Sequence, residues 1–306
     1  MLRIGTRGSP LALAQANDVR TRLMAVHGLG EADVTLRVIK TTGDAIQDRP
    51  LSEAGGKGLF TKEIEEALIA GEIDLAVHSM KDVPTLLPDG LVISTILKRE
   101  DVRDAFISLK YASLATMPAG AIVGTSSLRR HAQVRRARPD LAVVEFRGNV
   151  ETRLRKLADG VADATFLAMA GLNRLGLSAR ATSAIETSVM LPAVAQGAVG
   201  IEIRAGDATT AARLGPLNHE PTAICVSAER AFLAKLEGSC RTPIAGLAQL
   251  EDGRLVFRGA ILTLDGRVCH ETARTGGAGQ AAALGHDAGA ELLARAGPHF
   301  FKAVAG

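Results

Sequence analysis

The sequence predicts an α/β protein made of two similar lobes with a cleft between them, followed by a smaller C-terminal α+β domain. Three observations support this fold class. Short apolar runs alternate with helical patterns through the first two thirds of the chain. In that part, a strand that runs through Gly-Thr into a helix start is followed by the spacing G-x2-D-x5-M, and this order occurs twice. The last third instead shows strand–turn–strand patterns with Asp-Gly turns at Asp252-Gly253 and Asp265-Gly266.

The first lobe begins with a strand that runs into a helix start. Leu2–Ile4 reads as a strand, a Gly-rich turn follows, and Ser9 with Pro10 is typical of an N-cap and a first helical position. The segment 41–58 is rich in Gly, Asp and Pro and has no clear period, which predicts a long loop. The other expected elements of this lobe are a helix to about Val26, a strand at 34–40, a helix at 61–70 and a strand at 74–78.

The second lobe repeats this order. Ile122–Gly124 is a strand that runs through Gly-Thr into a helix start, as the first strand of the chain does. The spacing G-x2-D-x5-M occurs at 71–80 and again at 160–169. Two matches in the same order favour a duplicated lobe, each copy presenting a helix N-terminus. The other expected elements of this lobe are a helix that starts at Thr125-Ser126-Ser127 and ends at about Arg136, a helix from Asn149 to about Ala158, and strands at 141–146 and 164–167.

A strand-like run that ends near 204 is expected to return the chain to the first lobe. The C-terminal domain is expected to contain a helix from about Thr222 and a last helix at 280–296.

Composition argues against several function classes. The net charge is +3, aromatic residues are 3% and Trp is absent, so nucleic-acid binding is disfavoured. No window is long and apolar enough to span a bilayer, and no signal peptide is evident, so a cytoplasmic protein is expected. The three cysteines include no C-x-x-C pair, which argues against a disulfide framework and a zinc site, and no metal is expected.

Arginines are concentrated between positions 129 and 155. Arg129 and Arg130 follow a Thr-Ser-Ser helix start, where free N–H groups and the helix dipole favour an anion. Guanidinium groups bind carboxylates with two hydrogen bonds and a permanent charge. We therefore predict an anion site and expect Arg135, Arg136 and Arg138 to form a solvated helix face. The further arginines in or near predicted helix starts are Arg7, Arg147 and Arg153.

The segment His78-Ser79-Met80-Lys81-Asp82-Val83-Pro84 follows a predicted strand. Ligand chemistry in open α/β folds sits at the C-terminal ends of strands. A Lys-Asp pair beside a turn is usually only a surface ion pair, but an Asp among arginines stays ionised and can steady a developing cation or move a proton. We expect His78 to be a packed side chain rather than a catalyst.

Cys240 lies in the sequence Glu-Gly-Ser-Cys-Arg-Thr-Pro, which is typical of a loop. Arg241 beside it favours the thiolate. No His signature accompanies it, so a covalent anchor fits better than acyl transfer. Cys225 and Cys269 lie in apolar regular segments and are predicted to be core cysteines.

Together these motifs resemble the porphobilinogen deaminase family over essentially the whole chain. Two departures are small: Thr42 stands where many members have Arg, so no ligand contact is assumed there, and Ser239 stands where Gly is frequent. The motifs that carry the resemblance are IGTRGSPLALAQA (4–16), GGKGLF (55–60), AVHSMKDVP (76–84), VGTSSLRR (123–130), RGNVxTRL (147–154), LPAVAQGAVG (191–200) and EGSCRTP (237–243).

The resemblance implies a transferase that joins four porphobilinogen units head to tail, releases ammonia at each step, and frees the linear tetrapyrrole hydroxymethylbilane by hydrolysis. It implies a dipyrromethane cofactor attached to Cys240 through a thioether, and Asp82 as the catalytic residue. The implied cofactor-binding residues are Cys240, Lys81, Asp82, Thr125, Ser126, Ser127, Arg129 and Arg130. The implied substrate-binding residues are Arg7, Ser9, Lys57, Phe60, Arg147, Arg153, Arg174 and Gln196, with Lys57 and Phe60 in a mobile loop.

The implied fold has two lobes of periplasmic-binding-protein type and a third domain that carries the cysteine. The predicted division is 1–97 with 198–216 for domain 1, 98–197 for domain 2, and 217–306 for domain 3. A monomer that binds porphobilinogen but no nucleic acid or membrane is expected. The alternative from another class is a non-catalytic two-lobed anion-binding protein, which would give Cys240 no role.

Overall fold

The computed structural model describes residues 1–45, 58–238, 242–297 and 300. The chain forms two compact units, which are described separately. Unit 1 comprises 1–100 and 197–223, and unit 2 comprises 101–196 and 224–306. Among the helices in the described ranges, none has the length and apolar character needed to cross a membrane.

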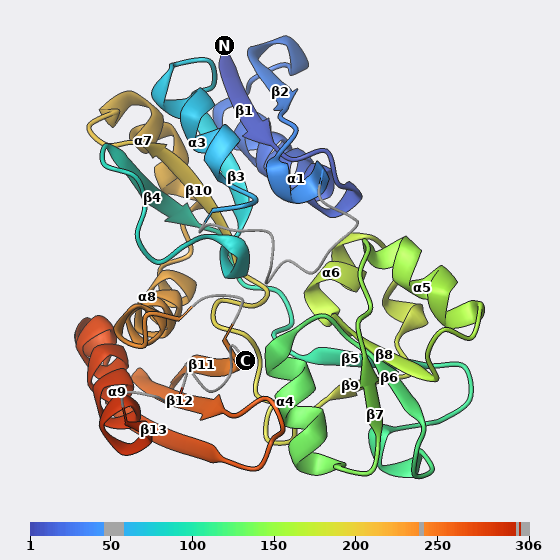
Figure 1. The fold of residues 1–306 in the computed structure, drawn as a ribbon. Coiled ribbons are helices and arrows are strands. Elements are labelled where there is room, and N and C mark those ends of the chain that lie inside the picture. The colour runs from blue at the N-terminus through green and yellow to red at the C-terminus, as the bar shows by residue number, and fades with distance from the viewer. Residues whose placement is uncertain (46–57, 239–241, 298–299, 301–306) are drawn as a thin grey trace. The chain divides into compact units, whose positions relative to one another are not determined.

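Unit 1 contains a five-stranded sheet with helices on both faces, which we call lobe 1 (Figure 1). The strand order is β2-β1-β3-β10-β4; β1 is parallel to β2 and β3, and β10 is antiparallel to β3 and β4. The chain therefore returns to the first lobe through β10, as predicted. The bounds are β1 Leu2–Thr6, α1 Pro10–His27, β2 Val34–Val38, α2 Thr42–Ala45, α3 Lys62–Ile69, β3 Leu75–Ser79, β4 Leu91–Ile96, β10 Val199–Arg204 and α7 Ala208–Leu214.

Successive side chains of β3 point to opposite faces of the sheet, and each face packs against a different helix. Leu75 and Val77 pack with Val19 and Leu23 of α1 in one core cluster. Ala76, on the opposite face, packs with Leu68 of α3 in another. His78 continues the α3 face, and the turn Met80–Asp82 follows the end of the strand.

Unit 2 contains a second five-stranded sheet, which we call lobe 2, with the order β7-β6-β8-β5-β9. β6 is parallel to β7 and β8, whereas β5 is antiparallel to β8 and β9. This is the same arrangement as in lobe 1. The bounds are β5 Asp104–Ser108, β6 Ile122–Gly124, α4 Leu128–Ala137, β7 Ala142–Val144, α5 Val150–Ala158, β8 Ala164–Ala168, α6 Met169–Arg174 and β9 Ser183–Ile185.

One aspartate fixes the same junction in each lobe. The Asp74 Oδ2 atom accepts a hydrogen bond from the Arg3 backbone N–H at 2.8 Å. The Asp163 Oδ2 atom accepts one from the Ile122 backbone N–H at 2.9 Å. Asp74 and Asp163 are the aspartates of the repeated G-x2-D-x5-M spacing, so the structure supports the predicted duplication.

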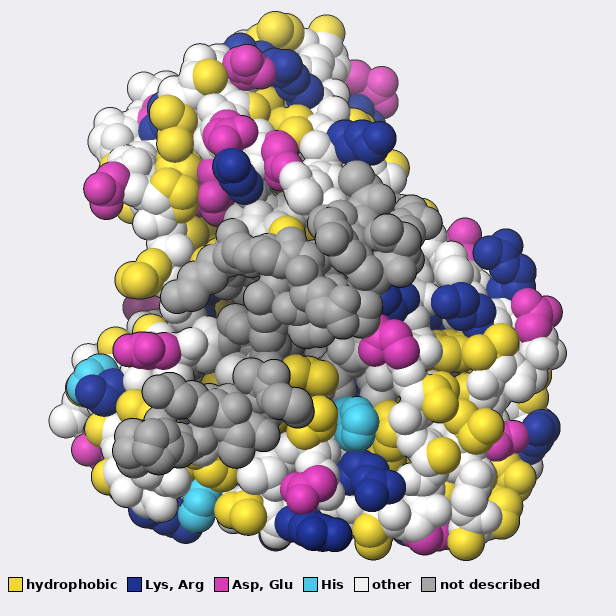
Figure 2. All heavy atoms as spheres, viewed as in Figure 1, with side chains coloured by type: hydrophobic (Ala, Val, Ile, Leu, Met, Phe, Trp, Pro, Cys, Tyr) yellow, Lys and Arg dark blue, Asp and Glu magenta, His cyan; other side chains and the backbone are white. Residues whose placement is uncertain are grey.

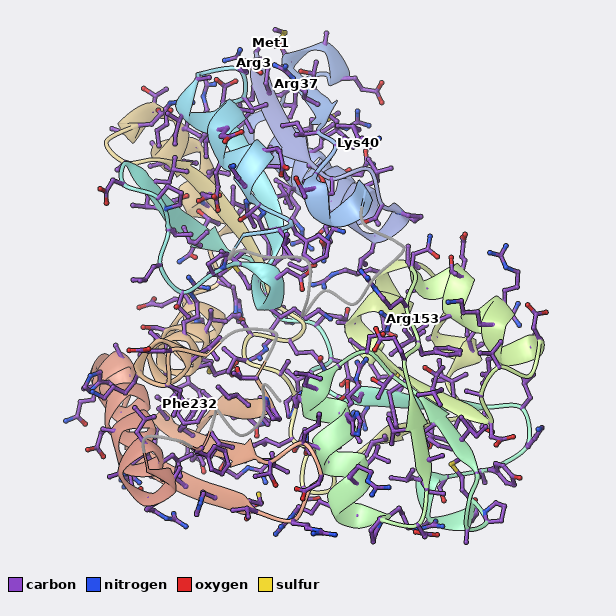
Figure 3. All side chains as sticks on the ribbon, in the orientation of Figure 1. Met1, Arg3, Arg37, Lys40, Arg153 and Phe232 are labelled. Carbon is purple, nitrogen blue, oxygen red and sulfur yellow. The ribbon has the colours of Figure 1, made fainter. Side chains whose placement is uncertain are left out.

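The rest of unit 2 is a three-stranded antiparallel sheet covered by helices. Phe232 packs against Phe257 of the sheet with ring centroids 5.0 Å apart (Figure 3). Gly285 of α9 lets this helix approach α8 closely, because a Cβ atom at position 285 would lie 1.9 Å from the Ala228 carbonyl oxygen of α8. The bounds are α8 Glu220–Lys235, β11 Ile244–Glu251, β12 Arg254–Leu262, β13 Cys269–Gly277 and α9 Ala281–Ala296.

The predicted fold class is confirmed: two sheet-and-helix lobes and a smaller α+β part at the C-terminus. The predicted cleft and the division into three domains stay predictions. The predicted loop at 41–58 is partly wrong, because a short helix occupies Thr42–Ala45. The Thr42 backbone N–H donates to Glu63 Oε1 at 2.9 Å, which holds this helix to α3.

Three side-chain predictions need correction. Cys225 is buried as expected, but Cys269 is half-buried and lines a cavity formed with α4, so it is not a core cysteine. Arg136 is exposed, whereas Arg135 and Arg138 are half-buried. Both donate to backbone carbonyls, Arg135 to Leu141 and Arg138 to Met117 among others, so these two side chains help to hold the local backbone.

Candidate active site

Asp82 lies at the C-terminal end of β3 in unit 1, beside a small cavity. The volume of the cavity is about 20 Å³. Three of the predicted site residues, Arg7, Phe60 and Asp82, line it together. The remaining lining residues are Ala12, Gln15, Thr61, Val77, His78 and Ser79.

The walls of this cavity are held by specific contacts. The Arg7 guanidinium lies over the Phe60 ring, 4.2 Å from its centroid, a cation–π contact. The buried Gln15 amide donates to the Ser79 hydroxyl at 2.9 Å. Arg7 and Asp82 thus place a cation and a carboxylate on the wall of the same cavity.

Two predicted residues of this region lie nearby in sequence but are not in the lining set. Ser9 is the N-cap of α1, and its hydroxyl accepts from the Ala12 backbone N–H at 3.3 Å. Lys81 is half-buried in the turn between β3 and Asp82. Ser9 and Lys81 are therefore sequence neighbours of cavity residues, but their side chains do not line the cavity.

His78 is packed, as predicted. It is 5% exposed, and its Nε2 atom lies 2.9 Å from Glu202 Oε2 of β10. Glu202 is fully buried. Sequence reasoning missed Glu202, although an acid inside the apolar run Val199–Arg204 was an available signal.

In unit 2, Arg129 and Arg130 converge on one buried carboxylate. Arg129 Nη1 lies 2.7 Å from Asp104 Oδ2, and Arg130 Nη2 lies 2.7 Å from Asp104 Oδ1. Burial alone would raise the pKa of Asp104, but the charges of the two arginines outweigh it and hold that pKa well below its ordinary value. Desolvation lowers the pKa of Arg129, and the negative charge of Asp104 offsets part of this shift.

Asp104 also organises a third predicted residue. The Gln196 amide donates to Asp104 Oδ1 at 3.0 Å and to the Val102 carbonyl at 2.8 Å. Asp104 was missed from the sequence. It opens the apolar strand DAFIS, and a charged residue in such a strand is buried only when it is paired.

The three hydroxyls before α4 accept hydrogen bonds from the local backbone. Ser127 caps the helix by accepting from the Arg130 N–H at 3.4 Å. Thr125 accepts from the Ser127 N–H, and Ser126 from the Phe146 N–H, both at 3.2 Å. These contacts fix the helix start on which Arg129 and Arg130 are mounted.

Arg153 lies on α5 (Figure 3) and donates through Nε to the Gly148 carbonyl at 2.9 Å. Burial, reinforced by the positive charges of Arg130 and Arg147, lowers the pKa of Arg153 to about 10. Arg147 and Arg174, the latter at the end of α6, are half-buried. Lys and Arg side chains also gather over α5 on the face drawn in Figure 2.

The charge balance of this region fits a group that carries several carboxylates. Asp104 is one acid between two buried arginines, and Arg153 experiences net repulsion from its cationic neighbours. Arg129 Nε is buried without a hydrogen-bond partner in the described part of the chain. An added carboxylate would offset the repulsion at Arg153 and could accept a hydrogen bond from Arg129 Nε.

Two predicted site residues, Cys240 and Lys57, lie outside the described residues. Within the described ranges, no group of three His, Cys, Asp or Glu side chains is arranged to hold a metal ion.

Solved structures with a similar fold were found at low identity. A periplasmic substrate-binding protein of an ABC transporter from Coxiella burnetii is 16% identical, with a TM-score of 0.44, and the match covers 75% of this chain and 97% of that one. The methionine-binding protein MetQ is also 16% identical, with a TM-score of 0.44, covering 71% and 89%. Values this low support no argument about ligand or activity.

The sequence comparisons are far closer. The family model "Porphobilinogen deaminase, dipyromethane cofactor binding domain" matches residues 2–212, and the model of the C-terminal domain matches 223–294. Proteins named porphobilinogen deaminase are 60% identical in Paracoccus denitrificans (98% of this chain, 96% of the relative) and 59% in Nitrobacter hamburgensis (99% and 96%). A chloroplastic one from Pisum sativum is 56% identical (98% and 83%). The chain therefore belongs to the porphobilinogen deaminase family.

Proposed function

We propose that this chain is a transferase that condenses four porphobilinogen molecules into hydroxymethylbilane in tetrapyrrole biosynthesis. The observation that carries this function is the identity of 56–60% to porphobilinogen deaminases over nearly the whole chain. The site chemistry agrees with it. One unit offers a carboxylate beside a cavity, and the other offers an excess of arginines.

Asp82 is the proposed catalytic residue. Loss of ammonia from the aminomethyl group of porphobilinogen leaves a positive charge on the substrate pyrrole. A carboxylate fixed at the end of a strand stabilises such a charge as it develops. The same carboxylate can accept the proton that the pyrrole carbon gives up after the new carbon–carbon bond forms.

The arginines are the proposed partners of the substrate's acetate and propionate groups. Arg7 lines the cavity that contains Asp82, so it is placed to hold a carboxylate of the reacting unit. Arg129, Arg130, Arg147, Arg153 and Arg174 are proposed to bind the carboxylates of the growing chain. Guanidinium groups suit this role because they stay charged and bind carboxylates with two hydrogen bonds.

The family model that matches residues 2–212 is that of the dipyrromethane cofactor-binding domain. When bound, this cofactor supplies the pyrrole carbon to which substrate units are joined. We propose that Cys240 holds it through a thioether. Its carboxylates would be held by Lys81 and by Arg129 and Arg130, on the helix start built by Thr125, Ser126 and Ser127. The Asp82 carboxylate would instead accept hydrogen bonds from the pyrrole N–H groups of the cofactor.

The finer assignments complete the proposal. Lys57 and Phe60 are proposed to cover the bound substrate, with Phe60 already on the cavity wall, and Ser9 and Gln196 to contact it. The protein is proposed to act as a cytoplasmic monomer divided into domains at 1–97 with 198–216, 98–197 and 217–306. The non-catalytic anion-binding alternative loses its support, because nothing in it requires identity to transferases across the whole chain.

The mass of the purified protein tests the proposal. We expect an excess equal to two pyrrole units and a pink colour with Ehrlich's reagent. Cys240→Ser should show neither, whereas the control Cys269→Ser, at the half-buried cysteine, should show both. An unmodified mass in a protein that also forms no tetrapyrrole from porphobilinogen would overturn the assignment.

A further inference from the structure

A buried acid–histidine cluster lies directly behind the cavity that contains Asp82. His78 and Glu202 are joined at 2.9 Å, and both are almost completely removed from solvent. Glu65 of α3 is 7% exposed and interacts electrostatically with both. Three titratable groups from three different elements thus meet inside lobe 1, and the mechanism above uses none of them.

The cluster has hydrogen-bonding capacity that its surroundings leave unused. In the described parts of the chain, Glu202 Oε1 and Glu65 Oε1 are buried and without a hydrogen-bond partner. A buried carboxylate oxygen in this state is costly, and a proton on one of the two acids reduces the cost. Burial raises the pKa of Glu65, the Thr61 hydroxyl lowers it in part, and the negative charge of Glu202 raises it further.

The cluster reaches the reaction cavity through His78. His78, Thr61 and Asp82 line the same space of about 20 Å³, which is enough for one water molecule. The Nε2 atom of His78 faces Glu202, and within the described residues its Nδ1 atom has no hydrogen-bond partner. The charged groups around the histidine are Glu202 on β10, Glu65 on α3, and Asp82 and Arg7 at the cavity.

We propose that His78, backed by Glu202 and Glu65, is a proton-relay residue that acts through Asp82 during each condensation. The proposal rests on the function proposed above and extends it to the removal of the proton. A purely structural role accounts for the cluster less well, because replacing a buried ion pair with apolar side chains of similar volume is often neutral or stabilising.

The proton balance is complete. The C–N bond of the substrate's CH2–NH3⁺ group breaks, and ammonia leaves with the bonding pair. After the new C–C bond forms, the pyrrole carbon of a unit already added loses its C–H proton, and that bonding pair restores the aromatic ring. Asp82 accepts the proton and passes it through water to His78 Nδ1, while the Nε2 proton moves to Glu202. The cluster then returns one proton to ammonia, which leaves as ammonium.

His78→Ala tests the relay directly, with the exposed His286→Ala as matched control. We expect turnover to fall at least about tenfold in His78→Ala, as for the loss of an acid–base group, and not in the control. Imidazole added to His78→Ala should restore turnover, and pyrazole, which has the same shape but is a far weaker base, should not. Equal effects of the two, or no loss of turnover, would overturn the relay.

Two isosteric variants keep the test decisive if His78→Ala does not fold. In Glu202→Gln, turnover should fall at least about tenfold, because the histidine loses the carboxylate that receives its Nε2 proton. Independently of turnover, the infrared difference between wild type and Glu65→Gln should keep the carbonyl band of a protonated carboxylic acid up to a higher pH than a solvent-exposed glutamate does, because burial raises the pKa of Glu65. Unchanged turnover in Glu202→Gln, or a carbonyl band that is lost at the same pH as that of an exposed glutamate, contradicts the proposal.

These outcomes separate the relay from the proposed function. A wild-type protein that makes no tetrapyrrole refutes the function itself. A wild-type protein that turns over normally, together with variants that show neither a loss of turnover nor rescue by imidazole, refutes only the relay.

Discussion

The two lobes of this chain share one scaffold but carry opposite charges. Their sheets have the same strand order, and Asp74 and Asp163 tie equivalent strands together through the same backbone hydrogen bond. After this shared part the sequences diverge. β3 is followed by Met80-Lys81-Asp82, whereas β8 is followed by Met169-Ala170-Gly171, with no acid at the equivalent place.

The buried acids differ in the same way. In lobe 1, Glu202 lies opposite Ala76 and pairs with a histidine. In lobe 2, Asp104 lies opposite Ala168, at the very end of β8, and pairs with two arginines. A histidine can gain or lose a proton near neutral pH, whereas an arginine cannot. This contrast supports the proposal that lobe 1 handles protons and lobe 2 holds anions.

The largest expected effect is at the acid of lobe 2. Asp104→Asn leaves two buried arginines without a counter-charge and should lower the free energy of unfolding by about 3–5 kcal/mol. Glu202→Gln in lobe 1 should lower the free energy of unfolding by less, because it leaves no permanently charged arginine buried without a counter-charge. Chemical denaturation of both variants, with exposed Asp89→Asn as control, measures the difference. Equal losses at Asp104 and Glu202 would contradict the contrast between the lobes.

The pH dependence of stability should also separate the two acids. The pKa of Asp104 is lowered in the folded state, so its contribution is complete above the unfolded pKa near 4 and is lost below it. The gap in unfolding free energy between wild type and Asp104→Asn should stay constant from pH 7 to 5. Below about pH 4 it should shrink by roughly 1.4 kcal/mol per pH unit. A gap that closes above pH 5 would show that Asp104 is not held ionised.

Glu65 in lobe 1 should behave with the opposite sign. Its folded-state pKa is raised, so the wild type loses stability as pH rises through the unfolded pKa of about 4.3 toward the folded value. Glu65→Gln should therefore gain stability relative to wild type with rising pH, by on the order of 1 kcal/mol. The same denaturation series from pH 4 to 8 checks this, and a variant that becomes relatively less stable as pH rises would refute it.

The smallest expected effect concerns the serine N-caps that both lobes have at a helix start. Ser9 caps α1 and Ser127 caps α4, each through its hydroxyl oxygen. Ser9→Ala and Ser127→Ala should each lower the free energy of unfolding by about 1 kcal/mol, because a backbone N–H loses its partner. Exposed Ser178→Ala should change nothing. A cost at only one of the two caps would show that the helix starts are not equivalent.

Local sequence signals predicted most of the fold. Ser9-Pro10, Asn149 and the repeated Asp spacing mark helix starts and strand junctions through chemistry that acts within a few residues, and the structure places them as expected. Asp82 and Arg7 were predicted from a strand end and a helix start and again through the family resemblance, whereas Phe60 was predicted through the resemblance alone. The cavity brings these three together. Asp104 and Glu202 were missed. An acid inside an apolar strand is a local signal of a buried, paired charge, but the partners lie 25 and 124 residues away and no local pattern identifies them.

The most direct test of the central claim is Asp82→Asn, with turnover and bound mass measured on the same sample. Asp82 is proposed to act on the substrate and Cys240 to hold the primer, so the two readouts should separate. We predict a fall in turnover of at least about 100-fold, with the mass excess of two pyrrole units retained. Wild-type turnover in this variant would contradict the assignment of lobe 1 as the reacting lobe.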